Sequence, residues 1–139
     1  MQRVLIDTGP LVAFINRKDR YHVWARTAFG RIAPPLLTCE AVLAEACFLL
    51  RKYSGGSASV MELLKRNVLT VAFRLDEHLE AIAASMNKYA GIPMSLADAC
   101  LVRMSEIETK SAIMTLDNDF RIYKRHGRQT IPLIIPAPD

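Results

Sequence analysis

The chain has 139 residues, 51% of them hydrophobic, and a formal net charge of +4. This length suits one domain, residues 1–139, with a single core, and the hydrophobic content excludes a disordered chain. No apolar run approaches the ~20 residues of a membrane-spanning helix, and no signal peptide precedes the first apolar segment, so we expect a cytoplasmic protein without membrane contact. The positive charge is compatible with RNA or DNA as a partner but does not establish one.

The chain begins with an apolar strand that ends in a carboxylate. Val4-Leu5-Ile6 runs into Asp7, and Thr8-Gly9-Pro10 predicts a tight turn before a helix over 10–16, with Pro10 in its first turn. The next expected elements are a helix over 21–30, a strand over 36–38, a helix over 39–52 and a helix over 58–66 capped by Ser57.

The second half of the chain continues the alternation of short apolar strands and helices. We expect a strand over 69–73, a helix over 76–89 capped by Asp76, a helix over 95–107, a strand over 111–115, a turn or short helix over 117–120 and a strand over 131–135. This order predicts an α/β fold with a central, mostly parallel sheet of about five strands and helices on both faces.

Two of the expected helices carry an isolated carboxylate. Glu45 is the only charge in residues 41–50, and Asp98 is the only charge in residues 96–102. A buried carboxylate normally has a partner or a metal ion, so both are candidates for a site. Each has a simpler interpretation: Glu45 lies on an exposed helix edge, or Asp98 forms a capping box with Ser95.

Two further acids come at strand ends. Asp7 closes the first strand and Asp117 follows the 111–115 strand, with Asp119 as a weaker candidate beside it. Ligands of open α/β sheets bind beyond the carboxyl ends of the strands, where both acids are expected. The simpler interpretation of Asp117 is an Asx turn.

If Asp7, Glu45, Asp98 and Asp117 converge, they need a counter-charge. Two like charges about 4 Å apart repel by roughly 4 kcal/mol at an effective dielectric constant near 20. Mg²⁺ and Mn²⁺ prefer such oxygen ligands. A basic protein with an acidic, metal-filled cleft suits phosphodiester hydrolysis, in which the metal polarises a phosphoryl oxygen.

At these residues the sequence resembles a PIN domain, and in particular the VapC-type toxin ribonucleases of VapBC toxin–antitoxin pairs. The resemblance extends from residue 1 to about 135 and rests on four pieces in order: LIDTGPLVA, EAVLAEACFLL, SLADACLV and MTLDNDF. It implies a Rossmann-like three-layer fold and Mg²⁺- or Mn²⁺-dependent cleavage of single-stranded RNA.

The resemblance also implies roles for single residues. Asp7, Glu45, Asp98 and Asp117 would be the catalytic, metal-binding acids, with Thr8 or Thr115 orienting them through hydroxyl hydrogen bonds. Asp119 matches a further metal ligand that only some members use. The implied partners are an RNA substrate, an antitoxin protein and a second copy of the chain in a homodimer.

Other functions remain open at this point. Some PIN domains process ribosomal RNA rather than act as toxins. A haloacid-dehalogenase-like phosphatase would place a second Asp two residues after Asp7, where Gly9 stands, and a phosphoacceptor receiver domain would need an acidic pair early in the chain. A non-catalytic RNA-binding module has no need of four acids at strand and helix ends.

Overall fold

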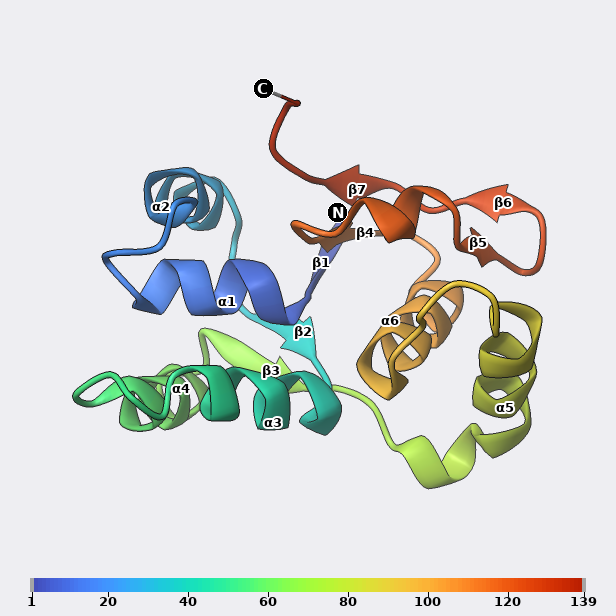
Figure 1. Cartoon of the computed structure of the whole chain (residues 1–139), viewed down its shortest axis with the longest axis horizontal. Coiled ribbons are helices and arrows are strands. Elements are labelled where there is room, and N and C mark those ends of the chain that lie inside the picture. The colour runs from blue at the N-terminus through green and yellow to red at the C-terminus, as the bar shows by residue number, and fades with distance from the viewer. Residues whose placement is uncertain (1, 139) are drawn as a thin grey trace.

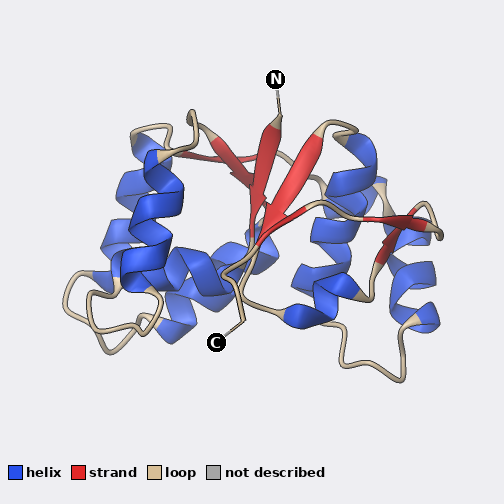
Figure 2. Ribbon diagram, turned by 90° about the horizontal axis from the view of Figure 1, so that it is seen from above, coloured by secondary structure: helices blue, strands red, loops and turns tan. Residues whose placement is uncertain are grey.

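A five-stranded parallel sheet forms the centre of the computed structural model, which describes residues 2–138 (Figures 1 and 2). Its strand order is β3-β2-β1-β4-β7, and every pairing is parallel. The strands are β1 (Arg3–Ile6), β2 (Leu36–Thr38), β3 (Leu69–Val71), β4 (Ser111–Met114) and β7 (Leu133–Ile134). The predicted α/β class with five parallel strands is therefore confirmed.

Six α-helices and two 3-10 helices cover the sheet in the described residues. The α-helices are α1 (Thr8–Ile15), α2 (His22–Gly30), α3 (Glu40–Leu49), α4 (Gly56–Lys65), α5 (Leu79–Lys88) and α6 (Leu96–Ile107). The 3-10 helices are η1 (Leu75–Glu77) and η2 (Asn118–Arg121), and a small antiparallel hairpin joins β5 (Lys124–Arg125) to β6 (Gln129–Thr130). Figures 1 and 2 show α1 to α4 on one side of the sheet and α5 and α6 on the other, which gives three layers.

The central strand β1 is apolar because both of its faces are covered. Leu5 and Ile6 are completely buried, and Ile6 pairs in register with Met114 of β4. The backbone N–H of Asp7 donates to the carbonyl of Met114 at 2.9 Å. This hydrogen bond brings the ends of β1 and β4 together, so the residues that follow them meet at one edge of the sheet.

Several predicted boundaries are wrong for identifiable reasons. Helix α1 begins at Thr8 without an intervening turn, because the Asp7 side chain caps it. The helix expected over 76–89 is split, and Asp76 does not cap α5. His78 lies between the two pieces, stacked on Phe73 at 4.9 Å and accepting a hydrogen bond from Arg103, and these tertiary contacts oppose a continuous helix.

The remaining differences lie at turns. Ser57 does not cap α4, which starts two residues earlier than expected, at Gly56, after Gly55 in the left-handed conformation (φ 71°). Helix α3 ends at Leu49 instead of residue 52, and the last strand is confined to β7 after Pro132. The hairpin of β5 and β6 was not predicted. In the described part of the chain, none of the helices has the length and apolar character needed to cross a membrane.

We expect Gly56→Ala to destabilise the fold. A Cβ at Gly56 would lie 2.5 Å from the carbonyl oxygen and 2.9 Å from the Cβ of Leu50, which is completely buried. Overpacking of this kind costs about 1–3 kcal/mol of unfolding free energy. At Gly30, the last residue of α2, an added Cβ meets nothing within 4 Å, so Gly30→Ala should be neutral or slightly stabilising. Urea denaturation of both variants measures the difference, and equal midpoints would contradict the prediction.

Candidate active site

Asp7 is held from two sides at the end of the central strand. Its Oδ1 accepts the backbone N–H of Thr8 at 2.7 Å, and its Oδ2 accepts the hydroxyl of Thr115 at 2.7 Å. The residue is only 7% exposed. A short carboxylate suits this place, because it caps α1 and also accepts a hydrogen bond from the residue that follows β4.

Glu45 faces the start of α1 from the neighbouring helix α3. Its Oε1 accepts the hydroxyl of Thr8 at 2.7 Å, so Thr8 contacts both Asp7 and Glu45. Glu45 is exposed, as the simpler interpretation of the sequence proposed. Its exposure is nevertheless toward a cleft that it shares with Asp7.

Asp98 forms the capping box expected as its simpler interpretation and also lines the cleft. It forms a capping box with Ser95: the backbone N–H of Ser95 donates to Asp98 Oδ2 at 3.1 Å, and the N–H of Asp98 donates to Ser95 Oγ at 3.0 Å. The side chain also lines the cleft and is 8% exposed. A second donor, the hydroxyl of Tyr123, lies 3.4 Å from the same Oδ2.

Asp117 forms the Asx turn expected as its simpler interpretation. Its Oδ1 accepts the N–H of Asp119 at 2.9 Å, and its own N–H donates to Thr115 Oγ1 at 3.0 Å. Asp117 also lines the cleft, whereas Asp119 is not among the lining residues. Thr115 therefore connects Asp117 to Asp7.

The cleft has a volume of about 600 Å³ and receives carboxylates from four separate elements. Its lining consists of Asp7, Thr8, Gly9, Glu45, Leu49, Pro93, Ser95, Asp98, Leu116 and Asp117. Among the described residues, the structure thus brings four of the five candidate acids to one place and leaves Asp119 beside it.

The electrostatics of the cleft reflect this crowding of acids. Burial raises the pKa of Asp7 from 3.8 to about 6, and the charges of Asp98 and Asp117 add to the increase, although the Thr115 and Thr8 hydrogen bonds oppose it. Burial also raises the pKa of Asp98, with contributions from Asp117 and Glu45. The two buried acids, Asp7 and Asp98, therefore respond to the negative charges of their neighbours in the cleft.

The donor set suits a hard divalent cation. Glu45 Oε2, Asp98 Oδ1 and Asp117 Oδ2 have no hydrogen-bond donor within residues 2–138, so each is available to a ligand. No three His, Cys, Asp or Glu side chains of that range form a ready-made metal cage. Mg²⁺ does not require one, because it usually keeps several waters and takes one or two carboxylates together with substrate phosphates.

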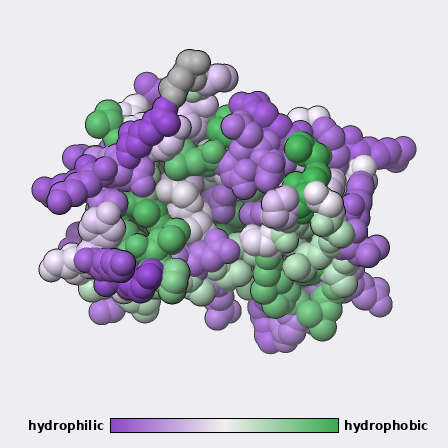
Figure 3. All heavy atoms as spheres, viewed as in Figure 1, coloured by the Kyte–Doolittle hydropathy of each residue, from purple (hydrophilic) through white to green (hydrophobic). Residues whose placement is uncertain are grey.

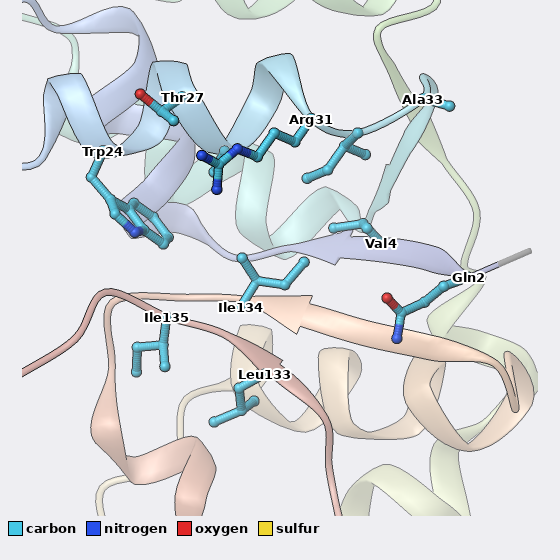
Figure 4. Close-up of a pocket in the computed structure, with 11 residues that line it drawn as sticks. Gln2, Val4, Trp24, Thr27, Arg31, Ala33, Leu133, Ile134 and Ile135 are labelled. Atoms are coloured by element: carbon cyan, nitrogen blue, oxygen red, sulfur yellow. The ribbon is translucent and has the colours of Figure 1, made fainter.

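A second hollow of about 630 Å³ lies between α2 and the strand β7 (Figure 4). Trp24 of α2 and Arg31, which follows α2, lie across it from Ile134 of β7, and none of the described residues that line it carries a carboxylate. Its described lining is therefore unlike the carboxylate-rich lining of the first cleft.

Tyr123 was not among the residues selected from the sequence, although it contacts Asp98 from 25 residues further along the chain. The available signal was the pair Phe120 and Tyr123, three residues apart, at the end of and just after the turn or short helix expected over 117–120. Such spacing also fits ordinary core packing, so the hydroxyl contact becomes visible only in the fold.

The PIN-domain sequence profile matches residues 4–125, and the chain therefore belongs to the PIN-domain family. Among solved structures it is similar to the VapC20 toxin of Mycobacterium tuberculosis, described as cleaving the sarcin–ricin loop. The TM-score is 0.71 at 21% sequence identity, and the match covers 84% of this chain and 91% of the toxin. This identity is too low to show more than a common fold. No curated protein is similar enough to the chain to count as a match.

We expect Asp7→Asn to change how stability depends on pH. Because the folded state raises the pKa of Asp7 to about 6, the folded chain keeps this proton when the unfolded chain has lost it. The wild type should therefore lose stability as the pH rises from about 4 to 6, by roughly 3 kcal/mol at most. The Asp7→Asn variant should not lose this stability, because Asn does not ionise.

The measurement is urea denaturation of both proteins with EDTA at pH 4 and pH 7.5. The variant should gain stability relative to the wild type between the two pH values. A difference that is the same at both pH values would show that Asp7 ionises normally.

Proposed function

We propose that this PIN-domain protein is an Mg²⁺- or Mn²⁺-dependent endoribonuclease that hydrolyses phosphodiester bonds of single-stranded RNA. The observation that carries the proposal is the cleft to which the β1–α1 junction, α3, α6 and the β4–η2 junction each contribute one carboxylate. A carboxylate-rich cleft would repel an RNA phosphate unless a cation lies between them. The membership of the PIN-domain family supports the same chemistry.

Asp7, Glu45, Asp98 and Asp117 would hold the metal ion, and a bound Mg²⁺ or Mn²⁺ supplies Lewis-acid activation of the phosphodiester. The chain's own contribution is orientation. Asp7 has both oxygens fixed by donors, and the other three acids have one oxygen fixed and one available. Donors of this kind fix the direction of a metal ligand before the metal arrives.

Positive charge elsewhere on the molecule supports RNA as the substrate. A hollow of about 420 Å³ between α1, α2 and α4 is lined by Arg17, Arg26 and Arg66 together with one acid, Glu62, which pairs with Arg66. Arginines attract the phosphate backbone independently of sequence. They would compensate for the repulsion that RNA meets at the carboxylates.

We further propose that the nuclease is the toxin of a toxin–antitoxin pair and is inhibited by an antitoxin protein. The support is the VapC-like order of motifs and the likeness of the fold to the VapC20 toxin. Processing of ribosomal RNA is the alternative within the same family. A small neighbouring gene encoding a DNA-binding protein that inhibits cleavage would favour the toxin.

We expect Asp98→Asn to abolish most of the cleavage while the protein stays folded. An Asn side chain keeps the size and can still accept the N–H of Ser95, so the helix cap survives with a loss of about 1 kcal/mol or less. Removal of a metal ligand should lower the rate by orders of magnitude, since ~1.4 kcal/mol of lost transition-state stabilisation is tenfold in rate. The assay is cleavage of single-stranded RNA with Mn²⁺ or EDTA, with the melting temperature as the folding measurement.

Asp76→Asn is the matched control, because Asp76 is an exposed acid paired with Arg74 and does not line the cleft. It should cleave like the wild type, and Asp119→Asn should lose less activity than Asp98→Asn. Cleavage that persists in EDTA would refute the metal requirement. If the Asp98→Asn variant melts at a lower temperature but cleaves RNA like the wild type, Asp98 serves only in the helix cap. If the wild-type protein binds RNA without cleaving it, the protein is a binding module.

We also propose a homodimer. Large hydrophobic side chains are exposed on several helices, among them Phe48 (60%), Leu79 (59%) and Met61 (50%). Figure 3 shows hydrophobic surface gathered over η1 and α5, and such patches tend to be buried between subunits. Sedimentation at micromolar concentration should give twice the mass of the chain, and a monomer would contradict the proposal.

A further inference from the structure

Tyr123 lies completely buried beside the cleft, between η2 and β5. Its ring packs edge-on against Tyr89, with centroids 5.0 Å apart, and against Phe120, with centroids 5.2 Å apart. A phenylalanine ring would make the same contacts. The packing therefore explains an aromatic ring at this position but not its hydroxyl group.

The hydroxyl of Tyr123 has one described partner, Asp98 Oδ2, at 3.4 Å. A buried hydroxyl without a partner costs free energy, so this contact gives the reason for a tyrosine here. The distance exceeds the ~2.7 Å of a strong hydroxyl–oxygen hydrogen bond. The contribution of Tyr123 to orienting Asp98 therefore depends on the packing that holds its ring in place more than on the strength of this bond.

The same oxygen of Asp98 also accepts the backbone N–H of Ser95 at 3.1 Å. Ser95 approaches from the start of α6 and Tyr123 from the segment after η2, so two separate parts of the chain hold Oδ2. No donor within residues 2–138 contacts Oδ1. Two donors on one oxygen fix the carboxylate and leave the other oxygen available.

We propose that Tyr123 is a positioning residue that orients Asp98 for metal binding. Its hydroxyl holds Oδ2 so that Oδ1 is presented to the cation without a change of rotamer. Tyr123 itself touches neither the metal nor the RNA. The inference rests on the proposed function, because it takes Asp98 as a metal ligand.

Tyr123→Phe and Tyr89→Phe form a matched pair of variants. Each removes one hydroxyl from the same aromatic cluster, but the hydroxyl of Tyr89 accepts the N–H of Lys124 at 3.0 Å and does not contact Asp98. The probe is Mn²⁺ alone, with affinity measured by electron paramagnetic resonance, followed by single-turnover RNA cleavage and melting temperature.

Tyr123→Phe should weaken Mn²⁺ binding by about tenfold, the lower end of the effect of losing a residue that orients a metal ligand. Cleavage should fall at limiting Mn²⁺ and recover at high Mn²⁺. Tyr89→Phe should bind Mn²⁺ like the wild type. 4-Aminophenylalanine at position 123, which restores a donor at the same place, should recover the affinity.

A double-mutant cycle with Asp98→Asn tests whether Tyr123 acts through Asp98. In the Asp98→Asn background, Tyr123→Phe should cause no further loss of Mn²⁺ affinity. An equal loss in both backgrounds, or wild-type affinity in Tyr123→Phe, would overturn the positioning role. So would a Tyr123→Phe protein that is unfolded at the assay temperature while Tyr89→Phe is folded, because the hydroxyl would then be structural.

These outcomes are distinct from a failure of the proposed function. If the wild type binds Mn²⁺ and cleaves RNA but Tyr123→Phe is unaffected, only the role of Tyr123 is lost. If the wild type neither binds Mn²⁺ nor cleaves RNA, the nuclease proposal and the positioning role fall together.

Discussion

The arrangement of the site depends on the two hydrogen bonds that the carboxylate of Asp7 accepts. One oxygen begins α1 by accepting the N–H of Thr8, and the other accepts the hydroxyl of Thr115 after β4. Thr8 continues the chain of hydrogen bonds to Glu45, and Thr115 continues it to the N–H of Asp117. Three acids from different parts of the sequence are therefore connected through two threonine residues, and the parallel pairing of β1 with β4 sets their spacing.

This arrangement places stability and function in opposition. Ionising a buried acid beside other acids costs free energy, and the raised pKa of Asp7 reflects this cost. The threonine hydroxyls reduce that cost but do not remove it, since burial remains the largest influence. Sites that prepare charge for a ligand commonly reduce the stability of the empty protein, and a bound cation would restore it.

The sequence was most informative where local pattern and tertiary structure agree. Apolar runs that end in Asp7 and before Asp117 located two strand ends. The isolated charges Glu45 and Asp98 lie on helices, as expected, and both line the cleft. The sequence was least informative where distant residues decide the conformation. His78 interrupts a helix because Phe73 and Arg103 hold it, and Tyr123 reaches Asp98 across the fold.

For Asp98 and Asp117, a local capping or turn role and a place in the cleft do not exclude one another. Asp98 both caps α6 and lines the cleft, and Asp117 both forms an Asx turn and lines the cleft. A capping interaction uses one carboxylate oxygen and leaves the second one available, so a local structural role can prepare a residue for chemistry. Sequence patterns cannot separate the two roles when one side chain performs both.

The two edges of the sheet have a consequence for how copies of this chain can assemble. Edge strand β7 has only two residues and is preceded by Pro132 and closely followed by Pro136, while the opposite edge strand β3 has three residues. Short strands and prolines, which lack an N–H group, are poor templates for the addition of another strand. The edges of the sheet therefore disfavour edge-to-edge growth into fibres, and they favour the helical surfaces for association between copies.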